Sequence, residues 1–552
     1  MNNKRLAVFL FLFLFTLVCG NLTVLPDFGK ADDGLDKTTI VSPWGGNAHL
    51  VFDSAKRHMD QICSAMKKAG IQFVRLDVYW SYEDLMVQQD LLDSAVFFAT
   101  KNDLEILLSV PTIPSKRDSL SVEKWCGMLQ SYAQRYNGKN AIRIGNLTLY
   151  PNIRYFEAMN EIDALEKKIS VPEAFGLIKK SSLAFRAGRP EGGINVVLQG
   201  FCTFEPYVKE LLFYRDLDNK SIADFVDIVS FHDYNKSEKG WVEDIQRRIN
   251  LFARAGLQNK ELWLTEYGSN FYEDSFEDQA SFFTKRSVVS LSYGIKKLFY
   301  YQFHYYGGNT FPLNNQREDF FGMIDTGIKN SYAEFLENRE DGNYAIMTGE
   351  KPIRVYISEK SKKRKWISLH SLNSTILPKL QLGGLKIRGD GFSVDSLALM
   401  DKKTKAKRIV WRGNVVLDSA SNMFLKLDGA TFASASKKDR ILVYISNIQN
   451  TMDEWDRLSP FPVYSSYSFL ASMLSEGATV PKMVMNAPKG IISYMWSNKK
   501  SEKIYIFWAD ANEAKTLDLK KIGLKGRVYN NYGDEMNTER LVVSRSPIFV
   551  IE

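Results

Sequence analysis

Short apolar runs alternate with helical patterns between residues 38 and 340. In 55–69, apolar residues recur every three or four positions, and Gly70 follows where that helix is expected to end. A β-branched and apolar run over 73–78 then predicts a strand. The predicted strands are 40–43, 73–78, 104–110, 153–159, 195–198, 227–230, 261–265 and 297–302, and the predicted helices are 55–69, 91–99, 125–135, 171–187, 241–255 and 278–293.

Eight strands that alternate with helices over ~300 residues are what a closed (β/α)8 barrel requires. An open, doubly wound sheet would also alternate, but it usually has fewer strands. No glycine-rich phosphate loop follows the first strand, as a nucleotide-binding sheet would need. The pattern therefore predicts an α/β fold, a (β/α)8 TIM barrel over residues 38–340.

The pattern changes after residue 340. Period-two runs, separated by turns rich in Gly, Asn, Asp and Lys, occur at 353–357, 440–445, 503–508 and 546–551. Such spacing is typical of antiparallel strands. We expect a C-terminal antiparallel β-sandwich domain over residues 341–552.

The N-terminus has the layout of a secretory signal peptide. Lys4 and Arg5 precede an apolar run over 6–18, which is too short to anchor the chain across a bilayer. Cleavage near Gly20 would remove residues 1–20 and export the protein, to an extracellular, periplasmic or envelope location. A lipid anchor on Cys19 is the weaker alternative, because the residue before this cysteine is not small.

Length and composition narrow the class of protein. With 552 residues the chain needs at least two domains, and 45% apolar with 25% charged residues is a globular balance. The net charge of +8 is uneven, because residues 351–412 hold 16 Lys and Arg against 4 Asp and Glu, and the rest nets −4. No nucleic-acid motif accompanies this segment, so no nucleic-acid partner is expected. A solvated basic face is favoured over contact with an anionic surface.

Cysteine and histidine usage gives no indication of a metal or cofactor. Cys63, Cys126 and Cys202 remain after cleavage, without a CxxC pair or an even framework. The 5 histidines form no HxH or HExxH pair, which disfavours a metal-dependent hydrolase. The oligomeric state cannot be inferred from the sequence.

Candidate chemistry gathers where the predicted strands end, which is where barrel enzymes carry their sites. Most notable are an Asn-Glu step at Asn160 and Glu161 and a Thr-Glu step ending at Glu266. Two opposed carboxylates are what retaining glycoside cleavage requires, with the carboxyl groups about 5–5.5 Å apart. The candidate residues at the strand ends are Asn47, His49, Arg75, Asp77, Trp80, Asn160, Glu161, His232, Tyr234, Glu266, Tyr267, Gln302, His304 and Tyr305.

Six stretches resemble clan A of the glycoside hydrolases. GIQFVRLDVYWSYED at 70–84 is similar to the second strand of that clan, and IRYFEAMNEID at 153–163 to its Asn-Glu signature. The remaining matches are VDIVSFHDY at 226–234, ELWLTEYGS at 261–269, FGMIDTGIKNSYAEF at 321–335 and GRVYNNYGDEMNTERLVVSRSPIFVIE at 526–552. The resemblance leans toward the β-xylosidase and α-L-iduronidase family. One departure is at strand eight, where the clan often has a sugar-binding Trp and this chain has Tyr300 and Tyr301.

The resemblance implies a secreted, retaining glycoside hydrolase acting on oligo- or polysaccharides. Glu266 would be the nucleophile, kept ionised by Arg75 and by a hydrogen bond from Tyr234. Glu161 would be the acid/base, which requires a raised pKa in the free enzyme. The remaining implied substrate-binding residues are Asn160 at the sugar 2-hydroxyl, His232 at a hydroxyl or at Glu161, and Asn47, His49, Trp80, Tyr267 and Gln302 around the pocket.

Each residue also has a structural interpretation. Arg75 would serve equally well to neutralise Asp77 inside the barrel, and Trp80 is more typical of packing. Glu157 has the strand parity of Glu161 but lies deeper, where a solvent-facing acid is not expected. The alternative function is a carbohydrate-binding protein on a catalytically silent barrel. The presence of both glutamates argues against it.

Overall fold

The computed structural model describes residues 38–51, 58–78, 85–114, 117–164, 169–203, 206–235, 237–269, 276–304, 321–325, 462–485, 487–510, 513–536 and 540–552, and only the strands between 336 and 460. The predicted signal peptide, Cys19 and Trp80 lie outside the described residues. The chain divides into two units, one of residues 40–477 and 531–533, the other of 1–39, 478–530 and 534–552.

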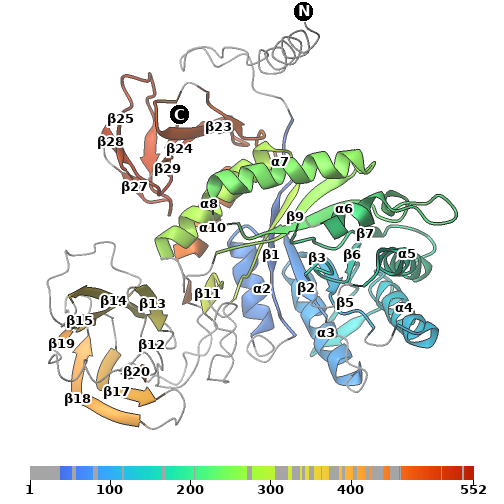
Figure 1. Ribbon diagram of the computed structural model, residues 1–552, viewed down its shortest axis with the longest axis horizontal. Helices are drawn as coiled ribbons and strands as arrows, with labels where there is room; N and C mark the ends of the chain where they lie inside the picture. Colours follow the sequence, from blue (N-terminus) through green and yellow to red (C-terminus); the bar gives the residue numbers. More distant parts are fainter. Residues whose placement is uncertain are drawn as a thin grey trace, which may run out of the picture. The chain divides into compact units, whose positions relative to one another are not determined.

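Eight parallel strands close into a barrel in the order β1-β10-β9-β8-β7-β6-β3-β2 (Figure 1). This confirms the predicted barrel. The strands are β1 (Trp44–Asn47), β2 (Phe73–Asp77), β3 (Glu105–Val110), β6 (Tyr155–Ala158), β7 (Asn195–Val197), β8 (Ile228–Asp233), β9 (Glu261–Tyr267) and β10 (Lys297–Tyr300).

The first strand differs from its prediction. It was expected at 40–43, but it runs over Trp44–Asn47, where Gly45 and Gly46 resemble a loop in the sequence. Gly45 lies beside Phe299 of β10, and a Cβ there would come within 2.6 Å of the Phe299 ring. Packing of a neighbouring strand therefore requires the glycine, and local sequence does not reveal this.

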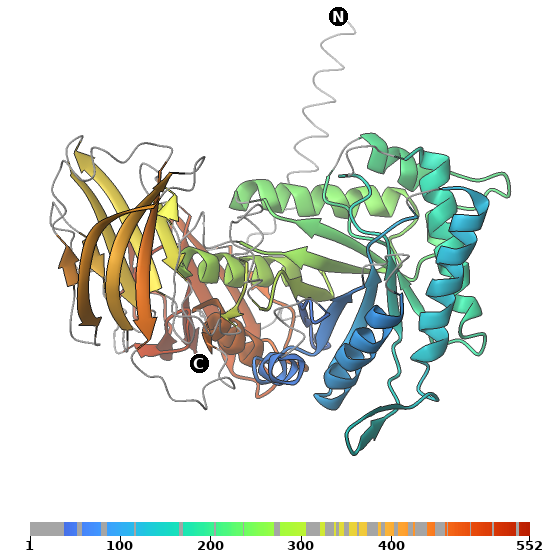
Figure 2. The same ribbon diagram turned by 90° about the horizontal axis from the view of Figure 1, so that it is seen from below.

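Helices cover the outside of the barrel. The N-terminus of α4 is capped by Asp118, whose side chain accepts from the Ser121 N–H, and Ser237 caps α7 in the same way. The helices that precede β10 are α2 (Met59–Lys68), α3 (Leu85–Lys101), α4 (Ser119–Arg135), α5 (Val171–Ala187), α6 (Pro206–Phe213), the short η2 (Ile222–Asp224), α7 (Glu238–Arg254) and α8 (Phe276–Ser292). The sequence pattern does not predict α6, η2 or the hairpin of β4 (Ile142–Ile144) and β5 (Leu147–Leu149), which projects in teal in Figure 2.

The last helix on the barrel comes from far along the chain. Helix α10 (Pro462–Met473) packs against α8, where Tyr467 stacks on Phe283 with 4.7 Å between ring centroids. The Tyr467 hydroxyl also donates to the Gly45 carbonyl at 3.0 Å, and that of Tyr464 to the Ala65 carbonyl at 3.0 Å. This helix is not among the predicted helices, although its buried positions follow helical spacing. These positions are Val463, Ser466, Tyr467, Leu470 and Ala471.

The barrel interior is built in two layers. The apolar layer consists of Phe73, Leu107, Val197, Ile228, Trp263 and Phe299. Side chains on a strand alternate between faces, so the next inward positions lie two residues further along. These positions are buried and largely polar: Arg75, Ser109, Glu157, Ser230 and Thr265. The polar layer lies toward the carboxyl ends of the strands, where barrel sites occur.

The part of the chain between residues 336 and 460 forms two sheets, one of four strands in the order β12-β20-β17-β18 and one of five in the order β13-β14-β15-β16-β19. Their pairs are antiparallel except β15 with β16. Strand β11 (Ile324–Asp325) pairs with β21 (Ser459–Pro460). The strands of the two sheets are β12 (Leu336–Glu337), β13 (Gly342–Ile346), β14 (Ile353–Ser361), β15 (Arg364–Ser371), β16 (Leu385–Ile387), β17 (Phe392–Asp401), β18 (Lys407–Leu417), β19 (Met423–Leu425) and β20 (Asp439–Asn447). Side chains of the basic segment 351–412 are outside the described part.

The C-terminal unit is a six-stranded antiparallel sheet in the order β22-β23-β24-β29-β26-β27, with a separate pair β25-β28. Its core includes Tyr505, Phe507, Leu541 and Val550. The strands are β22 (Lys482–Met483), β23 (Ile491–Ser497), β24 (Lys503–Ala509), β25 (Lys515–Asp518), β26 (Arg527–Tyr529), β27 (Glu535–Met536), β28 (Arg540–Val543) and β29 (Ile548–Ile551). The predicted sandwich and the domain boundary at residue 341 stay predictions.

None of the helices in the described ranges is both long enough and apolar enough to cross a membrane.

Gly45→Ala should lower the free energy of unfolding by about 1–3 kcal/mol, the usual cost of overpacking a core. The added methyl group would lie 2.6 Å from Phe299 Cδ1. Gly127→Ala in α4 is the matched control. Its Cβ would meet nothing within 4 Å, and alanine is favoured over glycine in a helix by about 0.5–1 kcal/mol. Urea unfolding, followed by circular dichroism, measures the free energy of unfolding of both variants. Equal changes in Gly45→Ala and Gly127→Ala would contradict the conclusion that Phe299 requires a glycine at position 45.

Candidate active site

Arg75 is the centre of the polar layer and is only 1% exposed. A guanidinium has five N–H groups, and all five donate to partners inside the barrel. These bonds run from Nε to Glu157 (2.7 Å), from Nη1 to Asn47 (3.0 Å) and Glu266 (2.7 Å), and from Nη2 to Ser109 (3.1 Å) and Asn160 (3.0 Å). Arg75 therefore fixes side chains of β1, β3, β6 and β9 relative to its own strand.

Glu266 is held at both oxygens. Its Oε1 accepts from Arg75 Nη1, and its Oε2 accepts from the Tyr234 hydroxyl at 2.7 Å. Burial, followed by the charge of Glu266, raises the pKa of Tyr234 well above its usual range, so the phenol keeps the proton that it donates. The predicted partners of Glu266 are thus the ones the structure brings to it.

Glu161 lies across from Glu266 at a sharp bend after β6. Met159 has φ +72° and Glu161 has φ +44°. Non-glycine residues in this region store about 1–3 kcal/mol each, and such strain is concentrated at functional sites. Glu161 is the more open of the two glutamates, with 27% of its side chain exposed.

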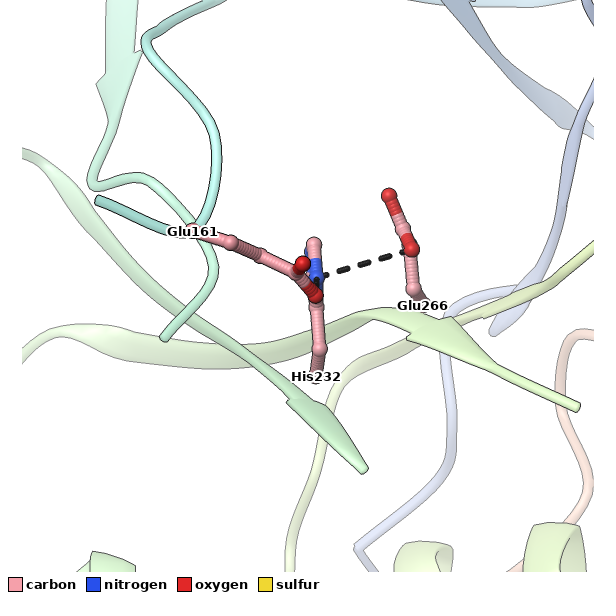
Figure 3. A group of neighbouring side chains, drawn as sticks. All are labelled: Glu161, His232 and Glu266. Atoms are coloured by element: carbon pink, nitrogen blue, oxygen red, sulfur yellow. Dashed lines mark hydrogen bonds and ion pairs between the residues drawn. The ribbon is translucent and has the colours of Figure 1, made fainter. Parts of the chain in front are cut away.

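His232 bridges the two carboxylates (Figure 3). Its Nδ1 lies 2.7 Å from Glu161 Oε1 and 3.5 Å from Glu266 Oε2. The imidazole is fully buried. A Cβ on Gly200 would come within 2.0 Å of His232 Nε2, so only glycine leaves room for the ring. This role of Gly200 was not predicted, because no local sequence pattern indicates it.

The pKa values of Glu161, His232 and Glu266 differ from the prediction that Glu161 would have the raised pKa. Burial would raise the pKa of Glu161, but the hydrogen bond and charge of His232 outweigh it and lower that pKa. Burial would lower the pKa of His232, yet the charges of Glu266 and Glu161 raise it. For Glu266, burial is the largest effect and raises the pKa despite the charges of His232 and Arg75. The expected raised pKa of Glu161 is therefore wrong for the free protein, because His232 lies beside it.

The pocket above these groups has a volume of about 310 Å³. It is lined by His49, Asp77, Pro111, Asn160, Glu161, Cys202, Tyr234, Glu266, Tyr301 and Phe321. Of the predicted substrate-binding residues, His49, Asn160 and Tyr234 line it, and Arg75 and His232 support it from below. Tyr301 takes a place on the wall where the resemblance suggested a Trp.

Three predicted pocket residues do not line it. Asn47 is buried, and its amide donates to the Thr265 carbonyl at 3.0 Å while accepting from Arg75. Tyr267 faces the other side of its strand, where its hydroxyl meets Ser287 of α8 at 2.8 Å. Gln302 is also fully buried. The register of β9 against β8 shifts between Leu264 and Glu266, so the alternation that places Thr265 inside is reset there, and Tyr267 lies on the opposite side from Glu266.

Pro111, Cys202, Tyr301 and Phe321 were not predicted as pocket residues. Pro111, Cys202 and Tyr301 follow the ends of β3, β7 and β10, and Phe321 precedes β11, so all four lie outside the regular strands. Burial raises the pKa of the Cys202 thiol, which also contacts Asp163 Oδ2 at 3.7 Å. That thiol is therefore not primed as a nucleophile.

Among the described residues, Glu161, His232 and Glu266 are also a group that could hold a metal ion. One ligand atom from each lies within 4.8 Å of the others. The same atoms are engaged with one another, so a cation would have to displace the proton of His232. The group therefore fits proton chemistry without an ion.

No protein-family model matches the chain, and no curated protein matches it. Among solved structures it is similar to a family 39 glycoside hydrolase from the gut symbiont Bacteroides cellulosilyticus WH2, with a TM-score of 0.51 and 14% identity over 94% of this chain and 82% of that one. SrfJ from Salmonella typhimurium has a TM-score of 0.48 and 11% identity over 93% and 90% of the two chains. An endo-β-1,6-glucanase has a TM-score of 0.47 and 8% identity over 94% and 92%. At such identities the first likeness shows a shared fold, a (β/α)8 barrel.

Proposed function

We propose that this protein is a retaining glycoside hydrolase that cleaves O-glycosidic bonds of oligo- or polysaccharides. Glu266 is the nucleophile and Glu161 the acid/base. The observation that carries the proposal is that these two carboxylates line one pocket with oxygens within 4.8 Å of each other. The N-terminal sequence supports export, so the protein acts outside the cytoplasm.

The short separation favours double displacement. Inverting enzymes keep their carboxyl groups about 6.5–9.5 Å apart to admit a water, whereas retaining enzymes need about 5–5.5 Å. In the first step a Glu266 oxygen bonds to the anomeric carbon while the glycosidic bond breaks and Glu161 protonates the leaving oxygen. In the second step Glu161 takes a proton from water, the water oxygen bonds to the anomeric carbon, and the bond to Glu266 breaks.

The Glu161–His232 pair supplies the proton for the first step. Its hydrogen bond of 2.7 Å joins the carboxylate to an imidazole whose pKa is raised by Glu266 and Glu161. When the leaving oxygen gains negative charge, the proton passes through Glu161 to that oxygen. His232 is then neutral, and Glu161 is ionised. The pair thus performs the task that a raised pKa on Glu161 alone was expected to perform.

Asn160 is oriented for the sugar. Its Oδ1 accepts from Arg75, which is donor-only, so Nδ2 is the end that remains to donate. A hydrogen bond from this amide to the 2-hydroxyl would strengthen as oxocarbenium character develops.

Glu266→Ala should abolish turnover of every glycoside, because no bond to the anomeric carbon can form. In Glu161→Ala, the turnover rate of substrates with poor leaving groups should fall about 10²–10⁴-fold, the usual contribution of general acid catalysis. The first step on a 2,4-dinitrophenyl glycoside should be spared, since that leaving group needs no proton. Single-turnover rates with the two kinds of leaving group measure this difference.

Azide tests the same assignment independently. It should rescue Glu161→Ala and give a glycosyl azide of retained configuration, as determined by NMR. Glu123→Ala, an exposed glutamate on α4, is the control and should behave as wild type. Equal losses on both leaving groups, or an azide of inverted configuration, would refute the roles given to Glu161 and Glu266.

The rate should depend on pH as a bell. Glu266 must be ionised, and its raised pKa places the acid limb above about 4.3, the usual value for Glu. The pair must hold a proton, and the raised pKa of His232 places the alkaline limb above about 6.5. In His232→Asn the proton rests on Glu161 alone, so the alkaline limb should move to lower pH.

Gly200→Ala should shift the alkaline limb in the same direction as His232→Asn, because its methyl group displaces the imidazole. Gly176→Ala on α5, whose Cβ would meet nothing within 4 Å, is the matched control. Profiles of kcat/KM against pH measure the limbs without depending on the amount of folded protein. An alkaline limb unmoved in both His232→Asn and Gly200→Ala would contradict the shared proton.

A further inference from the structure

One side of the pocket is formed by Asp77 and His49, which the proposed reaction does not use. Asp77 is 5% exposed and ends β2, and His49 follows β1. His49 Nδ1 lies 3.2 Å from Asp77 Oδ2, and its Nε2 lies 3.3 Å from the Tyr301 hydroxyl. Asp77 lines the pocket, and its Oδ1 lies 3.2 Å from Arg75 Nη1. A carboxylate that lines a pocket can accept hydrogen bonds from the hydroxyl groups of a ligand.

The reaction geometry directs a sugar toward this side. The anomeric carbon must lie at Glu266 and the leaving oxygen at Glu161. Strands β1, β2 and β10 are neighbours in the barrel, across from β6 and β7. The ring of the sugar that is transferred, the glycone, therefore extends away from Glu161 and toward Asp77. Asp77 and Glu266 both contact the same nitrogen, Nη1 of Arg75, so they lie within one sugar ring of each other.

The charges on this side do not suit an anionic sugar. Asp77 is ionised: burial would raise its pKa, but the charge of Arg75 and the contact with His49 lower it to about 2. Among the described residues that line the pocket there is no Lys or Arg. Arg75 below has every N–H engaged. Within this described lining, a glycone carboxylate would meet Asp77 and no Lys or Arg, and such like-charge contacts suppress the wrong partner.

We propose that Asp77 and His49 form a hydroxyl clamp that selects a neutral glycone and rejects uronic acids. An ionised carboxylate only accepts hydrogen bonds, and it has lone pairs for more than one hydroxyl. The clamp binds hydroxyls on the side of the ring remote from the anomeric carbon. This inference rests on the proposed function for the placement of the ring, and it names the substrate class of that site.

The test compares 4-nitrophenyl α- and β-glycosides of glucose, galactose, mannose, xylose and glucuronic acid. The wild type should cleave at least one neutral glycoside with a kcat/KM at least about 100-fold above that for the glucuronide. For the best neutral substrate, deletion of a clamped hydroxyl should cost the wild type about 10- to 100-fold, the loss of one charge-assisted hydrogen bond. In Asp77→Asn the same deletion should lower kcat/KM by a much smaller factor. The ratio of kcat/KM for neutral glycosides to that for the glucuronide should also be smaller than in the wild type.

Glu157→Gln is the matched control. Glu157 is a second buried carboxylate on Arg75, at 2.7 Å from Nε, and it does not line the pocket. Its substitution disturbs the charge around Arg75 as Asp77→Asn does, so absolute rates are expected to fall in both. Discrimination against the deoxy substrate should be lost only in Asp77→Asn. This result would distinguish recognition of a sugar hydroxyl by Asp77 from its contribution to the charge balance at Arg75.

The outcomes distinguish the clamp from the proposed function. If wild type and Asp77→Asn both turn over the substrate and lose the same factor when the hydroxyl is deleted, the clamp is refuted. The clamp is also refuted if the glucuronide is cleaved as well as the neutral glycosides. Neither outcome contradicts the proposed hydrolase function. If the wild type cleaves neither this panel nor any oligo- or polysaccharide built from the same sugars, the proposed function fails. Saturation-transfer NMR with free glucose, xylose and glucuronate then decides the clamp alone. Neutral sugars that bind the wild type but not Asp77→Asn support it, and any other binding result refutes it.

Discussion

The guanidinium of Arg75 is the interaction on which the rest of the site depends. It lies inside the barrel with every N–H bonded, and its partners come from β1, β3, β6 and β9. Removing one partner of a buried ion pair typically costs about 3–5 kcal/mol, since the other charge is left uncompensated. Arg75 faces three carboxylates, so the cluster remains net negative. That excess charge contributes to the raised pKa values of Glu266 and His232.

The two-layer interior explains why a charged cluster is tolerated in a barrel. The aromatic and aliphatic layer around Trp263 and Phe299 supplies the apolar burial that stabilises the closed sheet. One strand period higher, Ser109 and Glu157 accept hydrogen bonds from Arg75, and Ser230 donates to Glu157, so these inward positions can be polar. Two glycines maintain this arrangement: Gly45 admits the Phe299 ring into the lower layer, and Gly200 admits the His232 ring above. Stability and chemistry are thus separated by layer within one barrel.

A single group of side chains links the proton chemistry to the recognition of the sugar. His232 lies between the two glutamates, and Arg75 Nη1 lies between Glu266 and Asp77. Each charge therefore affects its neighbours, and no carboxylate in the pocket titrates independently. The proposed nucleophile shares one cation with the proposed clamp and another with the proposed acid/base.

The sequence pattern was sufficient to predict the barrel and most of the residues of its site. Alternation of strands and helices predicts seven of the eight strands near their places, and the ends of these strands predict Arg75, Glu161, His232 and Glu266 as site residues. Other features depend on contacts between distant parts of the chain. Gly45 belongs to a strand because Phe299 packs on it, and α10 covers the barrel because its tyrosines bond to Gly45 and Ala65, some 400 residues away. The pKa of Glu161 is lowered because His232, 71 positions later, reaches its carboxylate. Periodicity reports which face a residue presents, but it does not report which distant side chain that face will meet.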